Sequence, residues 1–206
     1  TMPPMEGLEF AGGVCYGEDM GVPGTMCFPN ISPDEQFGIG KWTDGEIIRA
    51  IREGVDHQGK TLMPAMPYAS YRDMSDEDVR AIVAYLRTVP PQSKQAPESE
   101  FGFFISRAFN FFPEPVEGPV PPPVSDDNVK YGEYLVKMSG CKDCHTVRSG
   151  ASLDEDLAFA GGQEFKLTGV LDVRTSNITP DMETGIGKWT KEQFIGRLKW
   201  FGDLGD

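Results

Sequence analysis

Histidine and cysteine are scarce in this chain of 206 residues, which contains two histidines and four cysteines. A structural zinc site uses four Cys or His ligands, and a catalytic zinc site uses three protein ligands plus water. Cys15 and Cys27 lie far in sequence from the other two cysteines, and His57 lies in the polar segment 56–59. The scarcity and spacing of these residues argue against a zinc site.

Basic residues are also few, because Lys and Arg total 19 against 32 Asp and Glu, which gives a net charge of −13. An acidic surface of this kind repels nucleic acid and anionic lipid. We therefore expect no nucleic-acid partner, and we expect any docking partner to present a basic face.

Long apolar runs are absent, since no segment approaches the roughly 20 residues needed to span a bilayer. The N-terminus lacks the charged, apolar and small-residue zones of a signal peptide, and its first residues read as the middle of a longer sequence. A convincing alternating strand pattern is missing too. With 24 glycines and 17 prolines, the chain is expected to consist of helices and long loops.

The residues 141–145 (CKDCH) are the most informative motif present. A Cys-x-x-Cys-His run is the attachment site of a c-type haem, because the two thiols can both reach the vinyl groups of one porphyrin. The following imidazole is then directed at the iron. A thioredoxin-like dithiol would need a βαβ context, which is not visible here. We predict haem c attached at Cys141 and Cys144, with His145 as an axial ligand and His57 as a surface residue.

Covalent haem attachment usually takes place on the oxidising side of the membrane, so we expect a periplasmic or exported protein. In that compartment Cys15 and Cys27 are candidates for a disulfide that closes a short glycine-rich loop. Two separate buried thiols are the alternative.

An internal repeat is the second strong signal. The block 30–34 (NISPD) recurs as 177–181 (NITPD), and the block 38–42 (GIGKW) recurs unchanged at 185–189. Upstream, 10–13 (FAGG) recurs at 159–162, so a small length change separates the blocks. Three matching blocks in the same order indicate two homologous domains.

Helix starts follow the second block in both copies. Thr43 with Glu46, and Thr190 with Gln193, form capping-box patterns ahead of apolar residues at helical spacing. Two further helices are expected. One begins after Ser75, with three acidic residues in its first turn, and ends before Pro90. The other runs from about Asp127 to Gly140.

Together these motifs resemble class I cytochromes c of the multi-domain type. The chain is similar to the di-haem or tri-haem cytochrome subunits of membrane-associated alcohol, aldehyde and sugar dehydrogenases. The resemblance implies an all-α fold of two tandem, loop-rich cytochrome c-like domains packed around covalent haem. The expected boundaries are 1–90 for the first domain, 91–126 for a linker rich in Phe and Pro, and 127–206 for the second domain.

The resemblance also implies a methionine as the second axial ligand of each haem. The segment 62–68 (LMPAMPY) matches the methionine loop and points to Met66, with Met63 as the alternative. By the repeat, the attachment motif of the first domain would precede Thr1, and the counterpart of Met66 would follow Asp206. We therefore expect two haems, one attached at Cys141 and Cys144 and the other attached upstream of Thr1. A single permuted domain that uses Met66 at the His145 iron is the other reading.

The expected function is electron relay between a dehydrogenase or quinol-oxidising donor and a cytochrome or oxidase acceptor, with no bond chemistry of its own. A di-haem peroxidase and a docking subunit of a dehydrogenase complex are the alternatives. Aromatic residues of the linker are expected to pack between the domains, or else to contact a partner or a membrane surface. Membrane association through further termini or through a partner stays open. The indoles of Trp42 and Trp189 are candidates for a haem propionate contact or for core packing.

Overall fold

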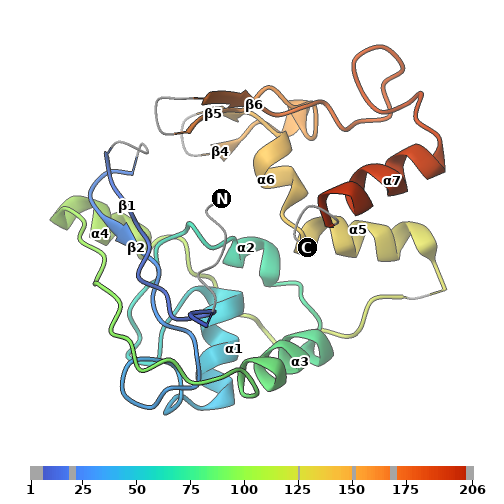
Figure 1. The fold of residues 1–206 in the computed structure, drawn as a ribbon. Coiled ribbons are helices and arrows are strands. Elements are labelled where there is room, and N and C mark those ends of the chain that lie inside the picture. The colour runs from blue at the N-terminus through green and yellow to red at the C-terminus, as the bar shows by residue number, and fades with distance from the viewer. Residues whose placement is uncertain (1–6, 19–21, 125, 150–151, 168–170, 203–206) are drawn as a thin grey trace. The chain divides into compact units, whose positions relative to one another are not determined.

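The computed structural model describes residues 7–18, 22–124, 126–149, 152–167 and 171–202, and these are mostly helices and loops (Figure 1). The chain divides into two compact units, residues 1–140 and 141–206. The helices of the first unit are α1 (Asp44–Glu53), α2 (Tyr68–Tyr71), α3 (Asp76–Leu86), α4 (Phe103–Phe109) and α5 (Asn128–Met138), and those of the second are α6 (Cys141–His145) and α7 (Lys191–Gly202). Among the described helices, none is both long enough and apolar enough to cross a membrane.

Three short antiparallel hairpins accompany the helices, and the sequence had not predicted them. They are β1 (Cys15–Tyr16) with β2 (Met26–Cys27), β3 (Arg148–Ser149) with β4 (Ser152–Leu153), and β5 (Glu164–Leu167) with β6 (Leu171–Arg174). Strands of two to four residues are too short to display the period-two alternation by which strands are recognised. The fold is therefore mostly helical, as expected, with a minor sheet component.

The core of the first unit lies between α1 and α3. Ile39, Ile47, Val83 and Leu86 form one buried cluster, and full burial of a side chain of this size contributes roughly 1.5–3 kcal/mol. The predicted caps are confirmed, because the capping box joins Thr43 to Glu46 and the Ser75 hydroxyl accepts a hydrogen bond from the Asp78 N–H. These caps place the two helix starts, and the core residues then meet at helical spacing.

A buried arginine joins three of these elements. Arg52 on α1 is 4% exposed and donates to the Asp76 carboxylate at 2.7 Å and to the Arg72 carbonyl at 3.3 Å. A buried charge is tolerated only when it is paired and hydrogen-bonded. The arrangement therefore holds the start of α3 and the end of α2 against α1.

The repeated sequence blocks adopt the same backbone hydrogen bonds in both units. Among the residues that the structure describes, Phe10 and Phe159 are the non-glycine residues with positive φ, at 65° and 63°. The matched bonds are Ile31 N to Phe10 O and Ile178 N to Phe159 O (both 3.0 Å), Ile39 N to Ser32 O and Ile186 N to Thr179 O (both 2.9 Å), and Trp42 N to Ile39 O and Trp189 N to Ile186 O (3.1 and 2.9 Å). The two copies thus share a loop conformation as well as a sequence.

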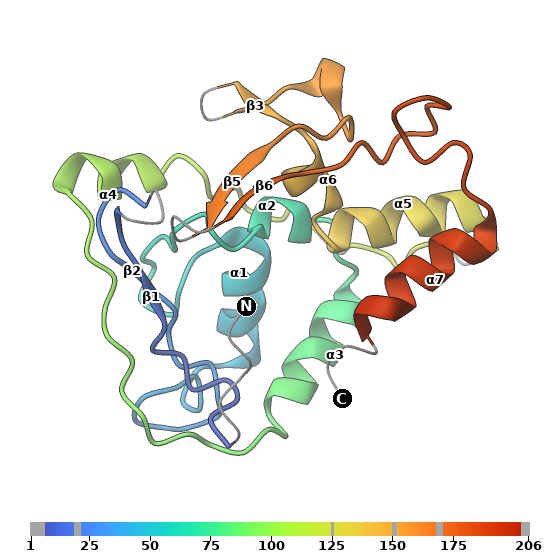
Figure 2. The same cartoon turned by 45° about the horizontal axis from the view of Figure 1, so that its top comes forward.

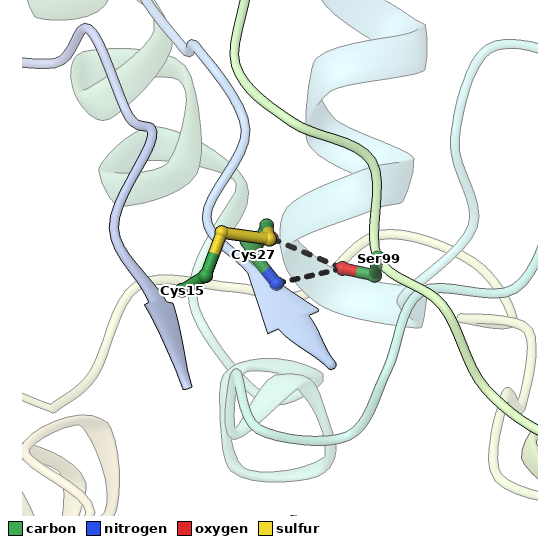
Figure 3. The surroundings of a disulfide bond; sticks show 3 residues. All are labelled: Cys15, Cys27 and Ser99. Carbon is green, nitrogen blue, oxygen red and sulfur yellow. Dashed lines mark hydrogen bonds between the residues drawn. A yellow bond between two sulfur atoms is a disulfide. The ribbon is translucent and has the colours of Figure 1, made fainter. Parts of the chain in front are cut away.

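The equivalent hairpins of the two units are closed by different chemistry at the same register position. Cys15 pairs with Cys27 in the first hairpin, and Glu164 pairs with Arg174 in the second. The cysteines form the predicted disulfide, and the Ser99 hydroxyl accepts a hydrogen bond from the Cys27 N–H at 2.9 Å (Figure 3). Glu164 and Arg174 form an ion pair instead.

The segment predicted to be a linker, 91–126, runs along the first unit and contains α4. The start of this segment is hydrogen-bonded to the first repeated loop. For example, the side-chain amide of Asn30 donates to the Gln92 carbonyl at 2.6 Å. Its end pairs with α3 through the Asp76 N–H and the Val120 carbonyl at 3.0 Å. Helix α5 follows and packs within the same unit, because the Tyr134 hydroxyl donates to the Asp78 carboxylate. The domain boundaries at 90 and 127 stay a prediction.

Candidate haem attachment site

Helix α6 brings the two free thiols and the imidazole together. Cys141 and Cys144 are three residues apart and His145 is four residues after Cys141, so all three share one face of the helix. Cys144 is exposed and Cys141 is partly buried, and neither is in a disulfide. Burial raises the pKa of the Cys141 thiol. The spacing allows both sulfurs to bond one flat ligand beside the imidazole.

The orientation of His145 suits a metal ligand. Its Nδ1 lies 2.7 Å from the Ser176 carbonyl oxygen. A carbonyl can only accept, so Nδ1 carries the proton and donates it. Nε2 then keeps its lone pair for a metal, and a second hydrogen bond of this kind orients most metal-bound histidines in proteins.

The loop that contains Phe159 and Gly161 holds the end of α6. The His145 carbonyl accepts from the Gly161 N–H at 2.7 Å, and the buried Thr146 hydroxyl accepts from the Phe159 N–H at 3.0 Å. A Cβ on Gly161, which has φ 74°, would lie 2.6 Å from the Ser176 carbonyl oxygen. Only glycine permits the approach that lets Ser176 reach the imidazole.

An apolar hollow opens in the same unit between the repeated loop and α7. Its lining is mainly apolar, with Thr190 and Lys191 beside Ile178, Pro180, Ile186, Trp189 and Phe194. Trp189 and Phe194 are each 44% exposed, whereas Ile47, the counterpart of Phe194 in the first repeat, is 3% exposed. A lining of this kind would suit the apolar face of a porphyrin.

The predicted ligand Met66 lies in the first unit, in the loop between α1 and α2. The loop is held at one end by the Leu62 N–H, which donates to the Gly54 carbonyl at 2.7 Å, and at the other by the Tyr68 N–H, which donates to the Met66 carbonyl at 2.8 Å. Met66 is partly buried, as is the alternative Met63. Met66 and the residues of α6 thus belong to different compact units, and the assignment of Met66 as a ligand stays a prediction.

Two polar groups of the first unit are buried without a hydrogen-bond partner among the described residues, namely Tyr68 Oη and Arg49 Nε. Tyr68 is 2% exposed, and burial raises its pKa. A buried polar group without a partner is costly. Sequence reasoning had not singled out these two residues: Arg49 belongs to no motif, and Tyr68 was quoted only as the last residue of the methionine loop 62–68. Trp42 packs at the edge of the core and stacks on His57, with ring centroids 4.4 Å apart.

Ser176 is the residue of this candidate site that the sequence did not reveal. It contributes a backbone carbonyl, which any residue type can supply, so its identity carried no signal. Its place directly before the repeated block 177–181 was the available clue. In the first unit Pro29 holds the same place before the block 30–34, and a Cβ on Gly12 would lie 2.4 Å from its carbonyl oxygen.

Comparison with known proteins gives consistent relatives. The chain is 32% identical over 222 residues to the cytochrome c subunit of the quinone alcohol dehydrogenase of Gluconacetobacter polyoxogenes, covering 98% of this chain and 46% of that subunit. It is 34% identical over 207 residues to the gluconate 2-dehydrogenase cytochrome c subunit of Pantoea cypripedii, covering 94% and 46%. It is 31% identical over 163 residues to a diheme cytochrome c-type protein of Cereibacter sphaeroides, covering 76% and 54%.

The chain spans about half the length of these relatives. No protein-family model matches it. The likeness therefore extends over almost all of this chain but over only part of the longer subunits.

Proposed function

This chain is homologous to the cytochrome c subunits of quinone-dependent alcohol, gluconate and fructose dehydrogenases, and on that premise we propose that it relays single electrons through covalently bound haem c. It performs no bond chemistry on a substrate. The donor is a dehydrogenase subunit or a quinol-oxidising complex, and the acceptor is another cytochrome or an oxidase. The place of action is the periplasm or another exported compartment.

The observation that carries the proposal is the orientation of His145. Cys141 and Cys144 would hold the porphyrin through thioether bonds, and Nε2 of His145 would ligate the iron while Nδ1 donates to the Ser176 carbonyl. The bound haem supplies an iron that gains and loses one electron. The hydrogen bond keeps the imidazole in one tautomer and one orientation, which limits the rearrangement that accompanies a change of iron charge.

A second haem is proposed for the first unit. The repeated backbone puts Pro29 where Ser176 lies in the second copy, with Gly12 and Gly161 making the same close approach to the two carbonyls. This equivalence supports a second haem that a histidine from upstream of Thr1 and Met66 would hold. The chain would then hold two tandem cytochrome c-like domains, for which we propose the boundaries 1–90 and 127–206.

The proposal is tested by intact mass and optical spectroscopy on the chain made with its natural flanking sequence in a host that attaches haem c. Two covalent haems per polypeptide and a methionine–iron(III) charge-transfer band are expected. The double variant Cys141→Ser, Cys144→Ser should lose one haem and retain the other.

A mass equal to the bare polypeptide would disprove electron relay through haem c. A high-spin ferric spectrum together with rapid peroxide consumption would instead favour a di-haem peroxidase, because peroxide chemistry requires an iron with an open or displaceable ligand. A docking role within a dehydrogenase complex is compatible with electron relay, since the relatives are named as subunits.

A further inference from the structure

The hydroxyl group of Tyr68 is buried at the start of α2 and has no hydrogen-bond partner among the described residues. The residue as a whole is 2% exposed. A buried hydroxyl without a partner is costly, whereas a phenylalanine would fill the same space without that cost. The burial of this hydroxyl therefore indicates an acceptor that the described residues do not supply.

The polar side chains that are buried elsewhere in the first unit are hydrogen-bonded. They are Asn30, Ser32, Asp34, Arg52 and Ser75. Among the described residues the other exception is Arg49 Nε, but the same guanidinium donates from Nη2 to the Asp56 carbonyl at 2.5 Å. Tyr68 has a single hydroxyl proton to donate, so its hydroxyl is the clearer sign of a missing partner.

The ring that carries this hydroxyl is held against α1. A Cβ added to Gly54, at the end of α1, would lie 2.5 Å from Cε1 of Tyr68, and the Gly54 carbonyl accepts from the Leu62 N–H at 2.7 Å. Figures 1 and 2 both show α2 beside α1. Because the ring packs against the backbone of α1, rotation of the hydroxyl toward water would open a cavity in the core.

Tyr68 also follows the proposed iron ligand directly along the chain. Its N–H donates to the Met66 carbonyl at 2.8 Å across Pro67, so a turn of one residue separates Met66 from Tyr68. The same loop thus carries a thioether that suits iron and, two residues later, a buried hydrogen-bond donor. A role for this donor at the haem rests on the second haem proposed above.

The chemistry of a haem limits what the hydroxyl can meet there. The pyrrole nitrogens of a haem bind the iron, so its strong hydrogen-bond acceptors are the two propionate carboxylates. A thioether is only a weak acceptor, and Met66 Sδ is not hydrogen-bonded to the Tyr68 hydroxyl in this structure. A carboxylate within a chain of net charge −13 is stabilised by a donor that adds no negative charge.

We propose that Tyr68 is a haem-binding residue of the first unit, and that its hydroxyl donates a hydrogen bond to a propionate of the first haem. A hydrogen bond to a carboxylate is stronger than one between neutral groups. It would offset the cost of burying both the hydroxyl and the propionate. The methionine loop would then hold the haem at two points, through the iron and through the propionate.

The test compares the haem-loaded, full-length wild type with Tyr68→Phe by resonance Raman spectroscopy, in which the propionate-bending band reports hydrogen bonding to the propionates. We expect this band of one haem to shift in Tyr68→Phe, while the methionine–iron(III) charge-transfer band is retained. The unfolding equilibrium constant of the first unit should rise about tenfold or more, because a hydrogen bond to a charged group is lost. Tyr85→Phe is the matched control, since Tyr85 on α3 is 61% exposed, and it should change neither readout.

Intact mass separates this role of Tyr68 from the proposed electron relay. Two covalent haems with an unshifted propionate band in Tyr68→Phe would overturn the role of Tyr68 and leave the relay standing. A protein with a single haem, at Cys141 and Cys144, would overturn the second haem and the role of Tyr68 together. A shifted charge-transfer band with an unshifted propionate band would assign the hydroxyl to Met66 Sδ instead, and would also overturn the propionate contact.

Discussion

At the scale of single residues, Gly54 has two roles in the first unit: it ends helix α1, and it lies against the side chain of Tyr68. It ends α1 in the left-handed region at φ 71°, and a Cβ added there would lie 2.5 Å from the ring of Tyr68. Left-handed φ disfavours other residues, and the buried Tyr68 ring has no room to withdraw. A single Cβ added at Gly54 would therefore strain the backbone and also clash with the Tyr68 ring in the core.

Gly54→Ala is expected to lower the free energy of unfolding of the first unit by roughly 2–4 kcal/mol, from the combined backbone and overpacking costs. Urea denaturation followed by fluorescence measures the change. Gly45→Ala is the control, because Gly45 lies in the first turn of the same helix with no atom within 4 Å of an added Cβ. That change should be neutral or stabilising by up to about 1 kcal/mol; equal losses in the two variants would contradict the argument.

The buried Arg52 makes one carboxylate sensitive to acid. The hydrogen bond from Arg52 lowers the pKa of Asp76 from its ordinary value of 3.8. A carboxyl whose pKa is lower in the folded state stabilises the fold fully above its unfolded, ordinary pKa, and that contribution is lost as the pH falls through the folded value. Asp76→Asn should therefore destabilise the fold at pH 7, by an amount that shrinks below pH 4.

Chemical denaturation at pH 7, 4 and 3 measures this difference. Glu77→Gln changes a neighbouring exposed carboxyl in the same first turn of α3 and serves as the control. If the difference in free energy of unfolding between wild type and Asp76→Asn is the same at all three pH values, Arg52 does not stabilise the ionised carboxylate.

The ligand role of Met66 is a prediction at the same scale. Met66→Leu preserves side-chain size but removes the thioether, so the two-haem protein should lose about half of its methionine–iron(III) charge-transfer band and the first haem should fall in potential. Met63→Leu should leave both unchanged. If Met63→Leu alone abolished that half of the band, the ligand would be Met63.

At the scale of elements, the two equivalent hairpins offer a comparison within one chain. The first is closed by the Cys15–Cys27 disulfide, and the second by the ion pair of Glu164 with Arg174, whose side chains are 57% and 69% exposed. A disulfide that closes a short loop contributes typically 2–4 kcal/mol, whereas an exposed ion pair contributes about 0–1 kcal/mol. The first hairpin is therefore the more tightly constrained.

The double variant Cys15→Ser, Cys27→Ser should lower the free energy of unfolding of the first unit by about 2–4 kcal/mol. Arg174→Ala should lower that of the second unit by no more than about 1 kcal/mol. Denaturation of the haem-loaded protein, read by hydrogen exchange in each hairpin, measures both. Equal effects would show that the disulfide does not constrain its hairpin.

At the scale of the whole molecule, the two units differ in how they bury apolar side chains. Among the described residues, every buried hydrophobic side chain lies between Ala11 and Val89, in the first unit. In the second unit Thr146 is buried, while Leu198 and Trp200 on α7 remain 63% and 51% exposed. A bound porphyrin would provide apolar surface against which such side chains can be buried.

The variant Cys141→Ser, Cys144→Ser, which cannot attach a haem there, should be cleaved by limited proteolysis first within 152–202. The first unit should resist at the same protease concentration, because local opening costs most where burial is greatest. Cleavage is read by mass spectrometry against the haem-loaded wild type. Equal protection of 152–202 in both proteins would show that the second unit is stable without its haem.

The sequence by itself determined the features that depend on residue identity at short range. The attachment motif, the caps at Thr43 and Ser75, and the repeat were all readable, because a thiol spacing, a capping hydroxyl and a shared loop are encoded within a few residues. The Cys15–Cys27 disulfide was foreseen as a candidate, from the compartment that haem attachment implies.

Tertiary structure decided what depends on neighbours that are distant in sequence. Ser176 reaches His145 through a backbone carbonyl that no residue type marks, and the exposure of Phe103 and Phe104 depends on which face of α4 the rest of the unit covers. The ion pair that closes the second hairpin also depends on distant neighbours, because the strand register is what places Glu164 opposite Arg174. Short-range chemistry predicts the cofactor, and long-range packing decides which carbonyl orients His145 and which aromatic side chains face outward.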